Sequence, residues 1–115
     1  MYKYLNETKH EFIMSKQLVR AGTSVSANIV EAEKAVSKRE FLSKMYIAYK
    51  ECCETEHWLK LLYNSGYITE KEFRSIYTDC DELRRILSSI TKTTREKLEN
   101  EGKKQTGAGK GGSGK

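Results

Sequence analysis

The chain contains no proline in its 115 residues. Proline is the strongest breaker of a helix interior, because it removes a backbone donor and collides with the preceding turn. Glycine, the next poorest helix former, is confined as well. Six of the eight glycines lie at or after Gly102, which leaves only Gly22 and Gly66 in the body of the chain. This distribution favours long uninterrupted helices over residues 1–101, followed by a tail of different character.

Three stretches of the body repeat apolar side chains with the 3.6-residue period of a helix. The first runs from about Phe12 to Val36, the second from Ser37 to Ser65, and the third begins after Thr69. The first apolar stripe comprises Leu18, Ala21, Gly22, Val25, Ile29, Ala32 and Val36. The second comprises Phe41, Met45, Ala48, Tyr49, Cys52, Leu59 and Leu62. The third comprises Phe73, Ile76, Tyr77, Cys80, Leu83, Leu87 and Ile90. Because glycine costs about 1 kcal/mol in a helix interior, Gly22 predicts a neighbouring helix that approaches closely.

Two capping boxes mark where the second and third helices begin. In both Ser37–Glu40 and Thr69–Glu72, a hydroxyl can accept the amide proton three residues on, and a glutamate can reach back. Ser65 and Gly66 end the second helix, since glycine tolerates the left-handed conformation that follows a helix. We expect the third helix to fade between Thr94 and Glu101.

The short connections between these helices force neighbours to run antiparallel, so the sequence predicts an all-α, up-down antiparallel helical bundle over residues 1–101. Each helix is about 40 Å long at 1.5 Å per residue. Such an elongated body needs a fourth helix or a partner to cover its apolar surface. The apolar residues at the N-terminus are too few to complete a fourth helix: Tyr2, Tyr4, Leu5, Phe12 and Ile13. We therefore expect the chain to form a homo-oligomer.

Residues 102–115 differ in composition from the body. They hold glycine, lysine and small polar residues, with no apolar side chain larger than alanine. Such a segment buries too little apolar surface to offset the conformational entropy that it would lose on ordering, so we expect a disordered Gly/Lys tail. The whole chain carries 21 basic and 16 acidic residues, and the tail holds four lysines and no acid. The body is left with 17 basic and 16 acidic residues, so attraction to phosphates depends on where its charges lie.

No apolar run is long enough to span a membrane, and the N-terminal residues lack the hydrophobic core of a signal peptide. The cysteines, Cys52, Cys53 and Cys80, are odd in number and lie within helical patterns. This usage is typical of reduced thiols that pack as small apolar groups in the cytosol. The sequence therefore predicts a cytoplasmic protein without membrane contact.

Two Glu-x-x-His motifs, Glu7–His10 and Glu54–His57, have the spacing that di-iron bundles use. Metal ligands must point into the bundle. Cys52 lies near the centre of the apolar stripe, and Glu54 and His57 are rotated about 140° to 160° from it around the helix axis, so both face outward. We interpret the spacing as chance and expect no metal or cofactor. Cys53 and His57 lie one turn apart without a third group to orient them. With no phosphate loop and no Ser-His-Asp set, the chain has no candidate catalytic residue and is not expected to be an enzyme.

Rows of basic residues run along the outer faces of two helices. On the third, Arg74, Arg85 and Lys92 lie within about 20° of one another. Such rows can follow a phosphate backbone, although Asp81 and Glu31 interrupt them, as is typical of an ordinary solvated face. The candidate residues for binding nucleic acid are Lys16, Arg20, Lys34, Lys38, Arg74, Arg85, Lys92 and Arg95. Four aromatic side chains allow two interpretations: they stack nucleic-acid bases, or, as is more common in a bundle, they fill cores and subunit interfaces. They are Tyr46, Trp58, Tyr63 and Tyr67.

Several segments of the body resemble the four-helix-bundle family named after the 23S rRNA intervening-sequence protein. They are Leu18–Ala32, with the sequence LVRAGTSVSANIVEA, then Ser37–Phe41 (SKREF), Glu54–Leu59 (ETEHWL) and Gly66–Ile68 (GYI). The segments occur in order and with the spacing of the family, and the resemblance covers about Glu11 to Thr94.

The resemblance implies a cytoplasmic bacterial bundle that assembles into a homopentamer and has no known enzymatic activity. Some members are encoded within intervening sequences of 23S rRNA genes. A relative, the accessory variability determinant of diversity-generating retroelements, binds a reverse transcriptase and nucleic acid through a basic surface. Members carry about twenty more residues before the segment that matches Tyr2–Leu5 here, so the resemblance predicts a four-helix bundle with a truncated first helix.

Two functions remain open from the sequence. One is a non-catalytic oligomer that associates with RNA, or with a partner such as a reverse transcriptase, through its basic outer faces. The other is a purely structural or protein-interaction bundle whose basic rows are merely solvated.

Overall fold

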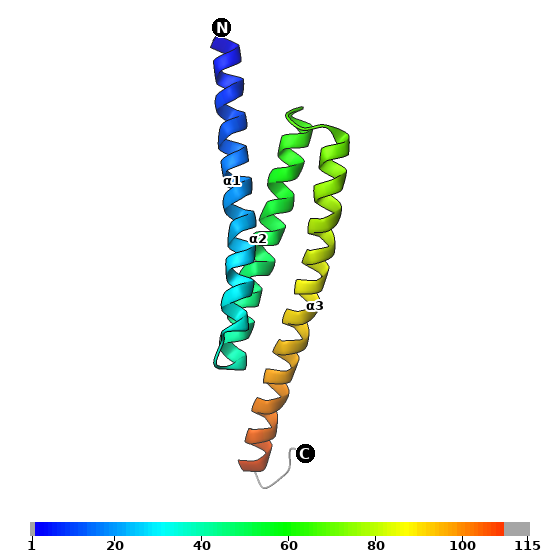
Figure 1. The fold of residues 1–115 in the computed structure, drawn as a ribbon. Helices are drawn as coiled ribbons and strands as arrows, with labels where there is room; N and C mark the ends of the chain where they lie inside the picture. The colour runs from blue at the N-terminus through cyan, green and yellow to red at the C-terminus, as the bar shows by residue number, and fades with distance from the viewer. Residues whose placement is uncertain (1, 110–115) are drawn as a thin grey trace.

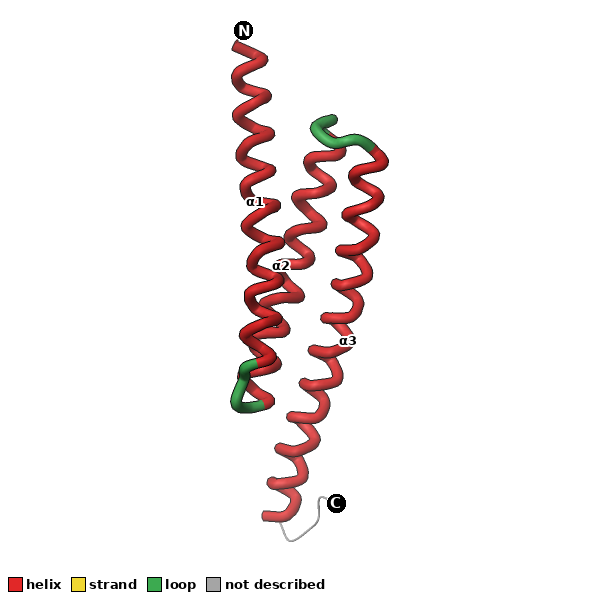
Figure 2. Tube along the Cα trace, viewed as in Figure 1, coloured by secondary structure: helices red, strands yellow, loops and turns green. Residues whose placement is uncertain are grey.

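The computed structural model describes the backbone of residues 2–109 and the side chains of residues 9–103. This part of the chain forms three helices and no strand: α1 (Tyr2–Glu33), α2 (Lys38–Asn64) and α3 (Glu70–Gly109). Each helix runs antiparallel to the next, and two short loops at opposite ends of the molecule join them (Figures 1 and 2). The expectation of an all-α fold is confirmed.

The central helix of the three is α2. It packs against both α1 and α3, whereas no Cα atom of α1 lies within 8 Å of a Cα atom of α3 in the described range. The molecule is elongated, with extents of 76 × 22 × 21 Å. The first turns of α1 extend past α2 at one end, and the last turns of α3 extend past it at the other (Figure 1). The described residues therefore form an open three-helix arrangement, and the four-helix bundle with a truncated first helix is not found among them.

All three helices contribute to one core. Its buried members are Val25, Ala32, Met45, Ala48, Cys52 and Leu87. These residues come from the predicted stripes, which are confirmed at their centres. The stripes are wrong at two positions: Val36 is 92% exposed and Ile76 is 49% exposed. Val36 lies in the loop after α1 has ended, and Ile76 lies on α3 near the end of the molecule where that helix begins.

The predicted helix boundaries after α1 are confirmed by hydrogen bonds. Ser37 Oγ accepts the amide of Glu40 at 3.0 Å. Thr69 forms a reciprocal box, since Glu72 N donates to Thr69 Oγ1 at 3.1 Å and Thr69 N donates to Glu72 Oε1 at 2.8 Å. At the end of α2, Gly66 has a φ of +81°, and the amides after Ser65 bond back to the carbonyl oxygens of Tyr63 and Leu62, which is a Schellman motif.

Two expectations for α1 are wrong. The helix was expected to begin at about Phe12, but it begins at Tyr2 and runs without interruption to Glu33. The segment before Phe12 contains neither proline nor glycine, so nothing interrupts the backbone hydrogen bonding there. The expected close approach at Gly22 is also absent, since a Cβ built on that residue would meet no atom within 4 Å. The neighbouring Ala21, at 0% exposure, occupies the tight contact instead.

The C-terminal part of α3 is longer than predicted. The helix does not fade between Thr94 and Glu101 but continues to Gly109, because residues 95–101 are mostly good helix formers and contain no glycine. The backbone of residues 102–109, which we expected to be disordered, thus continues the helix. Residues 110–115 of the predicted tail lie outside the described residues. The division of the chain at residue 101 stays a prediction.

Candidate nucleic-acid interface

Two of the candidate basic residues bridge helices. Arg20 of α1 reaches α2, where its Nη2 lies 2.5 Å from Glu54 Oε1 and its Nη1 lies 3.9 Å from Glu51 Oε1. Lys38, at the start of α2, pairs with Glu101 of α3. These two side chains link neighbouring helices at the surface, and their charges are already matched by carboxylates.

Two further candidates pair with acids of their own helix. Arg74 Nη2 lies 2.6 Å from Glu70 Oε2, and Arg85 Nη2 lies 2.8 Å from Asp81 Oδ2. The side chains of Arg74 and Arg85 remain about three-quarters exposed, at 75% and 74%. Exposed pairs of this kind contribute little to stability, so both guanidinium groups stay available to solvent and to ligands.

The other four candidates form no ion pair with any described residue: Lys16, Lys34, Lys92 and Arg95. Lys16 lies on α1 beside a shallow hollow that Phe12, Val19 and Arg20 also line. Lys92 and Arg95 lie one turn apart on α3. The structure therefore does not gather the eight candidates into one surface, since they are divided among α1, the loop end of α2, and α3.

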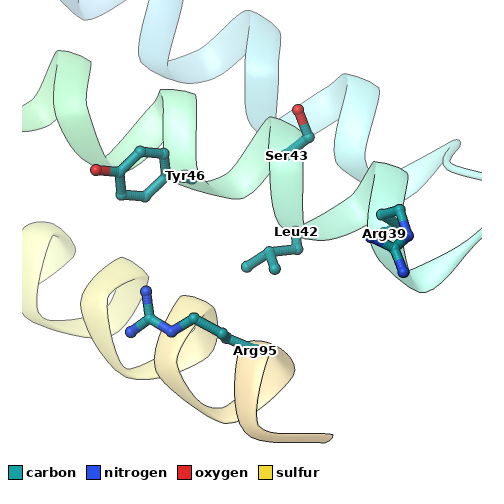
Figure 3. A pocket seen from close by; sticks show the side chains of 5 residues that line it. All are labelled: Arg39, Leu42, Ser43, Tyr46 and Arg95. Carbon is teal, nitrogen blue, oxygen red and sulfur yellow. The ribbon is translucent and has the colours of Figure 1, made fainter. Parts of the chain in front are cut away.

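A different group surrounds a hollow of about 330 Å³ between α2 and α3. Its lining residues are Arg39, Leu42, Ser43, Tyr46 and Arg95. In Figure 3, the guanidinium of Arg95 extends from α3 toward Leu42 and Tyr46 of α2, and Arg39 lies at the far end of the same row. Neither Arg39 nor Arg95 has an acidic partner among the described residues. The hollow thus combines two unpaired positive charges with an apolar floor.

Local sequence explains how α2 supplies its share of this lining. Arg39, Leu42, Ser43 and Tyr46 are spaced i, i+3, i+4 and i+7, which places them on one face of a helix. The Ser37 cap fixes where that helix begins. Tyr46 is 47% exposed, and Lys50, a turn further on, places its Nζ 5.6 Å from the Tyr46 ring centroid. The half-exposed ring of Tyr46 therefore lies near basic groups, and the ring of Tyr49 stacks beside it with centroids 6.2 Å apart.

Sequence reasoning missed Arg39, which was considered only as part of the capping box. The spacing of Arg39, Tyr46 and Lys50 along α2 could have indicated a second basic row. Nothing in the sequence could have placed Arg95 opposite this row, because that depends on how α2 and α3 are aligned. The other aromatic candidates lie differently. Tyr63 stacks on Phe73 with ring centroids 4.6 Å apart, as expected for packing.

A charged network lies on the same α2–α3 contact. Arg84 donates from Nε to Glu56 Oε2 at 3.1 Å and from Nη2 to Asp81 Oδ1 at 2.6 Å. Glu56 is only 8% exposed, so Arg84 supplies the partner that a buried carboxylate requires. The hydrogen bond from Arg84, with the added charge of Arg85, holds the pKa of Asp81 below its usual value. This network is satisfied internally and is structural.

No arrangement that could hold a metal occurs among the side chains of the described residues. Of the residues considered for iron, Glu54 and His57 lie at the surface, as their helical positions predict. His57 is exposed, and Glu54 is engaged with Arg20. No helix of the described part is long and apolar enough to cross a membrane.

These features define an all-α protein of antiparallel helices, with a basic hollow at one helix contact. The chain belongs to the 23S rRNA-intervening sequence protein family, whose family model matches residues 1–89. A similar solved structure is a protein of unknown function from the S23 ribosomal protein family of Bacteroides thetaiotaomicron. It is 49% identical with a TM-score of 0.70, and the match covers 79% of this chain and 84% of that one. No curated protein matches the chain.

Proposed function

We propose that this chain is a non-catalytic protein that assembles with itself in the cytoplasm and associates with RNA. The site is the α2–α3 hollow and the basic groups around it. The supporting observation is that Arg39 and Arg95, both without an acidic partner among the described residues, line the same hollow as the half-exposed ring of Tyr46. The assembly is a homopentamer, as the family resemblance implies, and a reverse transcriptase is the protein partner that the retroelement relative suggests.

The chemistry of the hollow suits single-stranded rather than double-stranded RNA. A guanidinium binds phosphate oxygens through paired N–H donors, and Lys92 adds a further charge one turn from Arg95. Unpaired bases can stack on an exposed tyrosine, whereas the bases of a duplex are already stacked on one another. Side chains that bind phosphate and a ring that stacks a base lie here on adjacent helices.

A second candidate is a protein-interaction bundle that binds no nucleic acid. It is favoured by the ion pairs at Arg20, Lys38, Arg74 and Arg85, which neutralise half of the basic residues singled out in the sequence. Under this alternative, the basic rows keep the protein soluble and the apolar groups on α1 bind a partner.

Binding of a short labelled single-stranded RNA, followed by fluorescence anisotropy over a salt series, tests the RNA proposal. Replacement of Arg39 or Arg95 by alanine should lower the slope of log affinity against log salt by about 1, if each contacts one phosphate. Tyr46→Leu should weaken binding by about 1–3 kcal/mol through lost stacking, and Tyr46→Phe should retain it. Lys60→Ala removes an exposed charge elsewhere on α2, beside the Tyr77 ring, and should leave binding unchanged.

Removal of residues 102–115 separates the tail from the body. Binding that survives this truncation and weakens in the Arg39 and Arg95 variants supports the hollow. Binding that weakens instead in Arg74→Ala, Arg85→Ala and Lys92→Ala moves the site to the outer row of α3. Absence of binding at about 50 mM salt, or binding lost with the tail alone, favours the protein-interaction alternative.

A further inference from the structure

Cys52 and Cys80 face each other across the α2–α3 contact. Their Sγ atoms lie 3.5 Å apart. Each sulfur also lies near the backbone carbonyl oxygen of the other residue, with 3.4 Å from Cys52 Sγ to Cys80 O and 3.6 Å from Cys80 Sγ to Cys52 O. Each side chain is therefore directed at the other helix, and the two thiols meet in a reciprocal arrangement.

The two thiols differ in their access to solvent. Cys52 is 1% exposed and belongs to the core, whereas Cys80 is half-buried at its edge. Either sulfur can donate to the other. The hydrogen bond from Cys80 lowers the pKa of Cys52, and the same bond, together with burial, raises the pKa of Cys80. Loss of one proton from the pair therefore leaves a thiolate stabilised by the neighbouring S–H group.

We propose that Cys52 and Cys80 are an oxidative modification site, at which a hydroperoxide converts the two thiols into an intramolecular disulfide between α2 and α3. A disulfide bond is about 2.05 Å long, so the sulfurs must approach by about 1.5 Å. The bond would close the loop that contains the α2–α3 turn and tie the middle of one helix to the other.

The reaction takes place in two displacements. The thiolate of Cys52, whose pKa is lowered by the hydrogen bond from Cys80, attacks one oxygen of the peroxide, the O–O bond breaks, and a sulfenic acid forms with release of water or an alcohol. The sulfur of Cys80 then attacks the sulfenic sulfur, the S–O bond breaks, and a molecule of water leaves as the disulfide forms. The two thiols together lose two electrons and two protons, and the peroxide accepts both.

Cys53 provides a matched control. It is half-buried and adjacent to Cys52 in the sequence, but it lies on another side of α2, against Tyr49, whose pKa it raises by hydrogen bonding. No sulfur of another described residue faces it. Proximity across the helix contact, rather than thiol exposure, is thus the property that distinguishes the Cys52–Cys80 pair.

The test treats the reduced full-length chain with hydrogen peroxide, then alkylates the remaining thiols and measures masses. We expect the oxidised chain to be lighter by the mass of two hydrogens before alkylation and to retain one thiol that can be alkylated. Digestion with trypsin should then yield a disulfide-linked peptide that joins residues 51–60 to residues 75–84. Cys53→Ser should form the same linked peptide, Cys52→Ser and Cys80→Ser should not, and dithiothreitol should restore all thiols. The disulfide should form faster in the folded chain than in the chain unfolded in guanidinium chloride.

Several results would overturn the proposal. Among them are oxygen adducts that accumulate on single cysteines without a linked peptide, disulfides between chains in place of the internal one, and loss of the internal link in Cys53→Ser. A folded chain that forms the link no faster than the unfolded chain contradicts it as well. The wild-type measurement and the Cys53→Ser control decide the outcome even if a substitution in the core impairs folding.

Discussion

Gly22 lies in the interior of α1 with open space where a side chain would begin. Gly22→Ala should raise the free energy of unfolding by about 1 kcal/mol, because alanine loses less backbone entropy in a helix. Chemical denaturation followed by circular dichroism measures the change. Gly66→Ala is the contrasting control, since Gly66 has a φ of +81° that alanine rarely adopts, and this variant should be destabilised. A loss of stability in Gly22→Ala would contradict the open surface at that position.

Single-residue contacts were predictable from the sequence only where they are local. The pairing of Thr69 with Glu72 follows from three residues of spacing, whereas Arg20 meets Glu54 across 34 residues. The spacing of basic residues along a helix predicts which face of the helix they occupy, but it does not predict which carboxylates on other helices they meet. The sequence therefore predicts Arg20 in an outer binding row although it bridges two helices, and it does not predict that Arg95 lies opposite the row of Arg39, Leu42 and Tyr46.

The start of α3 is held by charge-assisted hydrogen bonds. The backbone amide and the hydroxyl of Thr69 hold the pKa of Glu72 below its ordinary value of 4.5. Because the folded pKa is the lower one, the stability from this carboxylate is present above about pH 4.5 and is lost as the pH falls through the folded value. In Glu72→Gln, the free energy of unfolding should therefore depend less steeply on pH below 4.5. Urea titrations across this range measure the slope.

Glu82→Gln is a suitable control for that experiment. Glu82 is an exposed glutamate of the same helix, and it lies outside the capping box. Thr69→Ala should cost about 1 kcal/mol at neutral pH through loss of the cap. If the free energy of unfolding depends on pH in Glu72→Gln as it does in the wild type, protonation of Glu72 does not weaken the capping box and the prediction is wrong.

Whole helices were easier to predict at their starts and turns than at their free ends. Hydroxyl caps and Gly66 act within a few residues, so the loops on either side of α2 follow directly from the sequence. The first turns of α1 and the last turns of α3 have no such marker. There, an absence of proline allows the helix to continue, and the predicted boundaries fell short of Tyr2 and Gly109.

The arrangement of the whole molecule leaves α1 with packing on one side only. Its Ala21, Val25 and Ala32 are buried on the side of α2, and among the described residues no Cα atom of α3 lies within 8 Å of a Cα atom of α1. Exposed apolar side chains lie elsewhere along the helix. They are Phe12 at 61%, Ile13 at 46%, Val19 at 66% and Val30 at 45% exposure. Phe12, Val19 and Val30 recur at intervals of 7 and 11 residues, which places them in one row along the helix. A row of this kind is typical of a surface that packs against another helix.

We expect this row to mediate self-association, so the chain of 13.2 kDa should sediment at micromolar concentration as an oligomer of about five chain masses, as the family resemblance implies. Val19→Lys places a charge within the row and should shift the protein toward smaller species, because a lysine cannot be buried there without a partner. Val36→Lys makes the same substitution at a residue that is 92% exposed in the α1–α2 loop, and it should leave the sedimentation unchanged. A monodisperse wild-type monomer would exclude self-association through α1. An oligomer that Val19→Lys leaves intact would instead place the contact on another helix.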